Sequence, residues 1–159
     1  MSEKEEELLI ARARGLGFDP QKGHVSLVFT MRDRSQGRES SFSRTVPERE
    51  IHHEIRKVFG NFNDLSAAMG GNIFAVFHSL STITGEGRLN IRAACMKVIR
   101  ALEDYGIEGV AAGICSHGKG LIHSGRSYRE ARLAASLGPR VNVDGSVHFI
   151  EDLRIEEIL

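Results

Sequence analysis

The chain has 159 residues, the length of one domain that buries most of its apolar surface without disulfides or metal ions. Lysine plus arginine (21) balances aspartate plus glutamate (21), so no net charge attracts nucleic acid or an anionic membrane. No apolar run approaches the roughly twenty residues that cross a bilayer. Cys95 and Cys115 lie in predicted core elements and no secretion signal precedes them, which predicts reduced thiols in a cytoplasmic protein.

The first segment, residues 2–17, is predicted to be a helix. Acidic residues gather near its start and arginines near its end, as the helix dipole favours. Its apolar stripe is narrow, which indicates a connector or a dimer-forming segment rather than part of a core. We therefore assign residues 1–17 to an N-terminal connector helix and residues 18–159 to the domain that follows.

A strand and a helix are predicted next. Apolar residues alternate with others from His24 to Met31, which is typical of a strand, and the polar stretch 32–44 is predicted to be a loop. Thr45 and Glu48 have the spacing of a capping box, with a proline between them in the predicted first turn. A helix is therefore expected to start at Thr45 and to end at Gly60.

The stretch from Asp64 to His78 contains the best-specified turn. Two short apolar runs flank Gly70, Gly71 and Asn72. Glycine adopts positive φ without a steric penalty and asparagine tolerates it, so this chemistry predicts a tight hairpin. After the turn, apolar side chains on both faces indicate a strand in the middle of a covered sheet.

The second half of the chain is predicted to form a loop, a helix, a strand, a helix, a strand and a final helix. Their ranges are 81–90, 89–105, 109–116, 124–138, 147–150 and 151–159. Gly113 and the alanines before it leave room for another element to pack closely above that strand. Gly138 and Pro139 are predicted to stop the fourth helix.

This order of elements contains a βαββαβ core. Such a core is the α+β, ferredoxin-like arrangement, an antiparallel sheet with helices on one face. Here it carries an extra C-terminal strand and flanking terminal helices. The fold hosts many functions, so it does not decide one.

Histidines near Cys115 raise the question of a metal site. His117 and His123 make the tightest group with it, but zinc sites usually show a second pair of ligands, and none follows. A buried thiol beside loop histidines is therefore predicted. His52 and His53 would point about 100° apart on a helix, so they are predicted to form an exposed helix face.

Two other kinds of site were considered. No Gly-x-Ser-x-Gly elbow occurs, so hydrolase chemistry is not favoured, and a Ser-His-Asp or Cys-His triad stays an open alternative. Lys119 and Arg126 precede or begin a helix, where free amides bind anions, although the spacing is not that of a phosphate loop. With Gly70, Gly71 and Asn72, they are the candidate ligand-binding residues. Arginines at three-residue spacing along the same helix indicate a solvated face or a partner surface.

The hairpin turn resembles the signature turn of GGDEF domains, the diguanylate cyclases. Two further segments resemble their small-residue strand and their last helix. The chain is most similar to the degenerate GGDEF-like domain of bacterial sugar-diacid and purine-catabolism regulators, the CdaR/PucR class. The segments that carry the resemblance are Met69–Phe74, Gly106–Ser116 and Ser124–Val141, then Arg12–Asp19, Ser127–Arg132, Phe149, Asp152 and Leu153.

Departures from the cyclase pattern decide what the resemblance implies. In an active cyclase the residues after the two glycines are acidic, because carboxylates hold magnesium against the phosphates. Here they are Asn72 and Ile73, and the first strand offers Thr30 and Met31, with Asp33 arriving late. Neutral groups cannot replace that charge. We therefore expect no enzyme, with no catalytic residue, no metal and no cofactor.

The resemblance implies a non-catalytic regulatory domain between an effector sensor and a helix-turn-helix, neither of which this chain contains. Its expected partners are those neighbouring domains and a second copy in a homodimer, without direct contact to nucleic acid or membrane. The terminal helices would pass the sensor's state to the DNA-binding part. The alternative is a pseudo-cyclase domain that binds a nucleotide or a small carboxylate.

Overall fold

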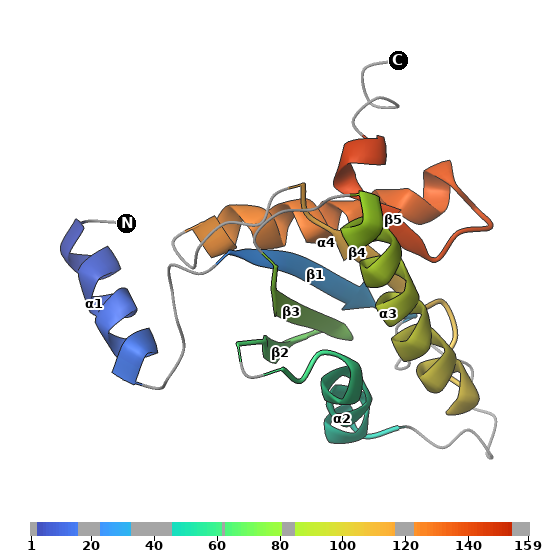
Figure 1. The fold of residues 1–159 in the computed structure, drawn as a ribbon. Coiled ribbons are helices and arrows are strands. Elements are labelled where there is room, and N and C mark those ends of the chain that lie inside the picture. Colours follow the sequence, from blue (N-terminus) through green and yellow to red (C-terminus); the bar gives the residue numbers. More distant parts are fainter. Residues whose placement is uncertain are drawn as a thin grey trace.

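The computed structural model describes residues 3–15, 23–32, 46–61, 63–80, 85–116 and 123–153. Its helices and strands follow one another along the chain in the predicted order (Figure 1). They are α1 (Glu3–Gly15), β1 (His24–Thr30), α2 (Glu48–Val58), β2 (Leu65–Gly70), β3 (Ile73–Ser79), α3 (Gly85–Asp104), β4 (Ala111–Ile114), α4 (Ser124–Val141) and β5 (Val147–Phe149). Residues 150–153 are again helical.

The strands form one five-stranded sheet in the order β2-β3-β1-β4-β5. β1 is antiparallel to both β3 and β4, with His24 opposite Ser79 and Leu27 opposite Ile114. The two strands of the hairpin are also antiparallel, and β5 joins β4 in parallel. The α+β ferredoxin-like core and the extra C-terminal strand are therefore confirmed.

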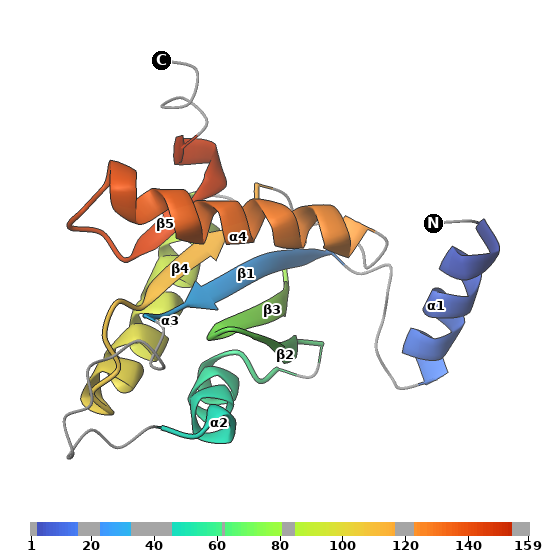
Figure 2. The same ribbon diagram turned by 180° about the vertical axis from the view of Figure 1, so that it is seen from behind.

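Helices cover both faces of this sheet. α2 and α3, the helices of the predicted core, lie on one face, and α4 lies on the other (Figures 1 and 2). Phe29 packs toward α2, its ring centroid 6.1 Å from that of Phe59. Val28, on the opposite face of β1, pairs with Gly113, which lies against α4. Two covered faces explain why β1 is buried from His24 to Phe29.

The closest approach of helix and sheet is between α4 and β4. A Cβ atom at Gly113 would overlap the carbonyl oxygen of Ala131 and the amide nitrogen of Ala135. The predicted close packing above this small-residue strand is confirmed. Because the backbones touch here, the position of α4 depends on residue 113 having no side chain.

Gly138 of α4 makes room for His148, a buried histidine of β5. A Cβ atom at Gly138 would overlap the His148 ring. Burial lowers the pKa of His148, opposed by a backbone hydrogen bond at Gly145 and aided by the charge of Arg92. Within the described part of the chain, its Nε2 has no hydrogen-bond partner. The ring is therefore held neutral against the helix.

Three predicted helix boundaries are wrong. α3 begins at Gly85, within the predicted loop 81–90. The negative charge of Glu86 in its first turn interacts favourably with the helix dipole and stabilises this start. α4 continues through Pro139 to Val141. A proline in the last turn removes only one helical hydrogen bond, and the Asn142 amide still donates to the Gly138 oxygen at 2.8 Å. α2 has Pro47 at its N-cap, not Thr45, which lies outside the described residues.

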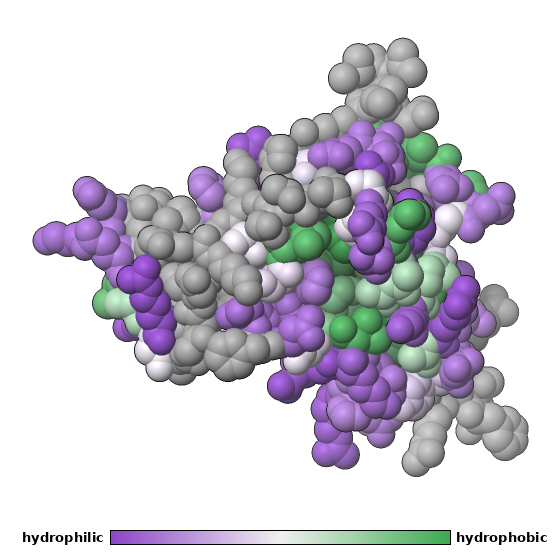
Figure 3. Space-filling view, in the orientation of Figure 1, coloured by the Kyte–Doolittle hydropathy of each residue, from purple (hydrophilic) through white to green (hydrophobic). Residues whose placement is uncertain are grey.

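Among the coloured residues of Figure 3, hydrophilic side chains dominate the outer edge, and apolar surface gathers in a band beside α3. None of the helices that the structure describes is long and apolar enough to cross a membrane.

Candidate functional site

The turn between β2 and β3 has the backbone that its sequence predicts. Gly71 and Asn72 are its two central residues, with φ values of 61° and 63°, and φ of Gly70 is 86°. Positive φ at both central residues is the requirement of a type I′ hairpin turn. The register of the two strands shifts between Ala68 and Gly70. The predicted tight turn at the paired glycines is confirmed.

Asn72 ties the turn to the end of β1. Its Nδ2 donates to the backbone oxygen of Arg32 at 3.3 Å. The Arg32 amide in turn donates to the backbone oxygen of Glu108 at 3.2 Å, and their side chains form an ion pair of 3.1 Å. Both side chains are more than two-thirds exposed, so this pair contributes little.

Neutral side chains occupy the place where the turn meets β1. Thr30 pairs with Ile73 across the strands, and Asn72 bonds to Arg32. Over the described ranges, no three His, Cys, Asp or Glu side chains gather closely enough to hold a metal ion. Asp33 lies outside those ranges. The described side chains here offer hydrogen bonds and the single ion pair of Arg32 with Glu108, rather than a cluster of carboxylate ligands.

Gly71→Val tests the conformation of this turn. We expect the free energy of unfolding to fall by about 2 kcal/mol, because a β-branched residue resists positive φ. The cause is backbone strain, since no described atom lies within 4 Å of a Cβ at Gly71. Urea denaturation measures the loss. Met69→Val, a half-exposed neighbour within β2, is the control and is expected to change stability little.

Asn72→Ala at the same turn is expected to cost about 1 kcal/mol and to leave the fold intact, because it removes an exposed hydrogen bond and a side chain that tolerates positive φ better than alanine. A loss as large as that of Gly71→Val would contradict this account of the turn.

The start of α4, the predicted anion-binding end, contains a carboxylate. Glu130 Oε2 accepts hydrogen bonds from the Ser116 amide at 3.1 Å and from the Ser116 hydroxyl at 2.8 Å. The Nε of Arg126, an exposed residue, lies 3.7 Å from Glu130 Oε1. This carboxylate links the end of β4 to α4 and offsets part of the positive charge of the arginine.

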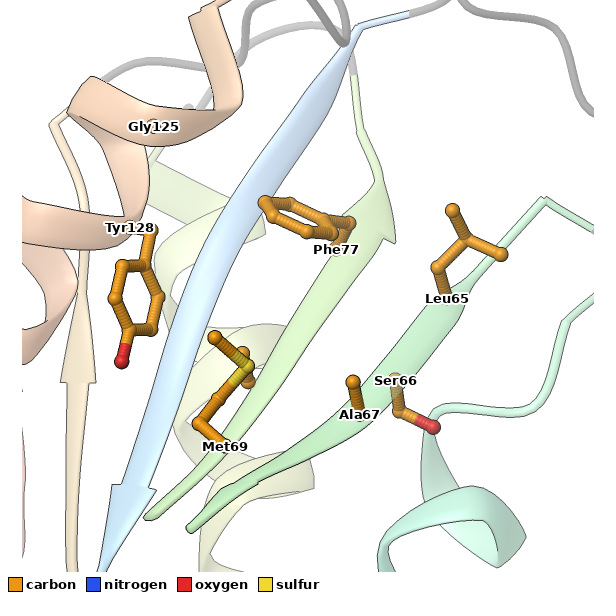
Figure 4. Close-up of a pocket in the computed structure, with 8 residues that line it drawn as sticks. Leu65, Ser66, Ala67, Met69, Phe77, Gly125 and Tyr128 are labelled. Carbon is orange, nitrogen blue, oxygen red and sulfur yellow. The ribbon is translucent and has the colours of Figure 1, made fainter. Parts of the chain in front are cut away.

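The structure separates the candidate ligand-binding residues. Gly125, next to Arg126, lies at the end of β3 where Phe77 is found (Figure 4). Gly70, Gly71 and Asn72 lie at the other end, where β3 begins at Ile73. Lys119 lies outside the described residues.

An apolar groove lies between the hairpin and α4. Its volume is about 440 Å³. Along β2, Leu65, Ala67 and Met69 line it, while Phe77 of β3 and Tyr128 of α4 stand across from them (Figure 4). No sequence pattern marked this groove, because its lining comes from three separate elements.

The buried carboxylate of Asp64, just before β2, accepts hydrogen bonds from residues at the end of β3 and before β2. Asp64 Oδ1 accepts from the Ser79 amide at 2.8 Å and pairs with His78 Nδ1 at 3.0 Å, and Oδ2 accepts from the Asn61 amide at 3.2 Å. Burial alone raises the pKa of Asp64, but these hydrogen bonds and the histidine hold it below its usual value. Sequence reasoning missed this group, because its partners lie up to 15 residues away.

His52 is not exposed as predicted. Its Nε2 lies 2.7 Å from Ser66 Oγ, and its ring packs near that of Phe74 at 6.4 Å between centroids. Only His53 is exposed, as expected. The Ser66 hydroxyl points away from the apolar groove in Figure 4, so it joins α2 to β2.

Cys115 is a buried thiol, as predicted. Its Sγ accepts from the Ser26 amide at 3.2 Å, and its own amide donates to the Ser26 oxygen at 3.1 Å. His123 is exposed at the start of α4, and His117 lies outside the described residues. The thiol therefore continues the pairing of β1 with β4.

Comparison with known families identifies the fold. A family model for the GGDEF-like domain matches residues 2–137. The chain belongs to the GGDEF-like domain family. The match runs from α1 nearly to the end of α4 and includes the hairpin. None of the curated protein sequences matches this GGDEF-like domain.

Solved structures of GGDEF domains share this fold. One is the GGDEF domain of TpbB, also called YfiN, from Pseudomonas aeruginosa, with a TM-score of 0.52, 18% identity, and coverage of 93% of this chain and 87% of that one. Another is an EAL/GGDEF domain protein from M. capsulatus, with a TM-score of 0.52, 19% identity, and coverage of 80% and 85%. A third is the GGDEF domain of DgcB from Caulobacter crescentus in complex with c-di-GMP, with a TM-score of 0.50, 16% identity, and coverage of 89% and 83%.

Proposed function

We propose that this GGDEF-like domain is a non-catalytic, signal-transmitting part of a cytoplasmic bacterial transcriptional regulator of the sugar-diacid or purine-catabolism type, the CdaR/PucR class. The observation that supports this most is the chemistry of the hairpin turn. It keeps the paired glycines, yet Asn72 and Ile73 follow them, and the asparagine side chain bonds to the Arg32 backbone. Condensation of two nucleoside triphosphates needs carboxylates that hold magnesium against the phosphates.

The C-terminal end of the domain supports a mechanical role. Arg88 of α3 pairs with Asp152 at 2.6 Å and lies near Glu151 at 3.7 Å. Its guanidinium also stacks over the Phe149 ring, 4.2 Å from the centroid. These contacts fix the helical residues 150–153 to α3. A displacement of α3 would therefore move the segment that leads toward a following domain, and the other expected partners are a sensor domain and a second copy.

Incubation with GTP and magnesium tests the absence of catalysis. We expect no cyclic dinucleotide product by chromatography, with an active diguanylate cyclase as the positive control. Product formation that Asn72→Ala abolishes would overturn the proposal. The neighbouring coding sequence tests the regulatory part of the proposal, because a reading frame with no DNA-binding segment would contradict it.

A pseudo-cyclase that binds a nucleotide or a small carboxylate is the second candidate. The open turn favours it, since no described atom lies within 4 Å of a Cβ at Gly70 or Gly71. Calorimetric titration with guanine nucleotides and sugar diacids separates the two. Absence of heat supports the purely mechanical role, and heat that Asn72→Ala removes supports ligand binding at the turn.

A further inference from the structure

None of the described helices covers the half of one sheet face that β2 and β3 form. α4 packs over β1, β4 and β5, and the same face of β2 and β3 forms the floor of the apolar groove. Leu65 and Met69 of this floor are 42% and 50% exposed. Side chains of this kind gain free energy when another apolar surface covers them.

One arginine borders the groove on the side of α4. The guanidinium of Arg129 reaches back over Gly125, a lining residue, with Nη1 3.8 Å from where a Cβ at 125 would lie. Arg126 instead pairs with Glu130, which bonds to Ser116 after β4. The groove therefore combines an apolar floor with one cation at its rim, and it matches a helix that is both apolar and acidic.

α1 has this chemistry and stands apart from the sheet (Figures 1 and 2). Its first turns carry Glu3, Glu5 and Glu7, followed by Leu8, which is 54% exposed. Arginines occupy its last turn. Its 13 residues span about 20 Å, similar to the length of β3.

The direction of the chain decides which copy of α1 fits. His24 pairs with Ser79 and Leu65 pairs with Phe77, so β1 starts at the end of the groove where Gly125 lies. The arginine end of α1 precedes β1 in the same chain, so α1 of that chain would bring its own arginines toward Arg129 of α4. A helix from another copy has no such tether, and its acidic turns can lie there instead.

We propose that α1 of a second copy of this chain occupies the groove formed by the hairpin and α4. Leu8 packs on Ala67 and Met69, and the acidic turns lie beside Arg129. Because the exchange is reciprocal, it closes a symmetric dimer. The inference goes beyond the proposed function and holds whether or not the domain regulates transcription.

Two variants of the full chain, each with one added cysteine, test this directly. Leu8→Cys and Met69→Cys are mixed in equal amounts and oxidised with diamide, which takes up the two hydrogens as the disulfide forms. The native Cys95 and Cys115 are buried, so they do not compete. We expect a covalent dimer from the mixture on a non-reducing gel. Leu89→Cys, 68% exposed on α3, replaces Met69→Cys as the control and is expected to give none.

Other outcomes would overturn the proposal. A covalent dimer that Leu8→Cys forms by itself, with no additional dimer when Met69→Cys is present, means that two α1 helices pair with each other. An internal disulfide in the double variant, with none from the mixture, means that α1 docks on its own chain.

Charge reversal supplies a second measurement by light scattering in solution. Arg129→Glu is expected to raise the dimer dissociation constant at least tenfold, while Arg100→Glu on α3 leaves it unchanged. A monomeric wild-type chain, or equal effects of both variants, would contradict the proposal.

Discussion

Gly113→Ala is expected to lower the free energy of unfolding by about 3 kcal/mol. The added Cβ would overlap backbone atoms of Ala131 and Ala135 in α4, and backbone cannot move aside as a flexible side chain can. The helix must therefore shift away from β4, which opens the contacts that bury this face of the sheet. Urea denaturation followed by circular dichroism measures the loss.

Gly125→Ala is the control for this substitution. At that position in α4 only the far end of the Arg129 side chain lies nearby, 3.8 Å from the added atom. Alanine in a helix is expected to be neutral or to stabilise it by a few tenths of a kcal/mol. If Gly113→Ala unfolds at the same urea concentration as Gly125→Ala, the close contact between β4 and α4 is wrong.

Asp64→Ala is also expected to cost about 3 kcal/mol. The Asp64 side chain is fully buried, and its removal leaves the Ser79 and Asn61 amides without their acceptor. His78, whose ring stacks edge-on against Phe59 at 5.3 Å, loses its charged partner as well. Asp144→Ala, at an exposed loop position, is the control and is expected to change stability by less than about 0.5 kcal/mol.

The pH dependence of Asp64→Asn checks the same carboxylate. Its pKa is held below the usual value of 3.8, so the folded state binds this proton less readily than the unfolded state. The stability that Asp64 contributes is therefore complete above pH 3.8 and is lost as the pH falls through the lowered pKa. The difference between wild type and Asp64→Asn should shrink on acidification. A difference that stays constant would mean that the charge has no role.

Local chemistry predicted much of this fold because it depends on neighbours in the sequence. Positive φ at Gly70, Gly71 and Asn72 follows from what those residues tolerate. The small residues around Gly113 predicted that another element would pack closely there. Alternating apolar residues predicted the strands, and the order of elements then predicted the ferredoxin-like core.

Local rules were wrong where packing outweighed them. Pro139 predicted the end of α4, but the helix continues to Val141. The lost hydrogen bond is small beside the burial of Ala135 against β4 and of Ala134 against Ile150 and Leu153. His52 was predicted to face solvent because the pattern of α2 does not reveal that Ser66 lies opposite.

By itself, the sequence determined the order of the elements, the hairpin turn and the absence of acidic residues directly after its glycines. Only the tertiary structure decided which distant groups meet. Asp64 reaches His78 across 14 positions, and Cys115 reaches Ser26 across 89. The apolar groove likewise joins β2, β3 and α4, because among the described helices α4 covers only the other half of that face. Such contacts depend on where helices cross the sheet, and no local periodicity encodes that.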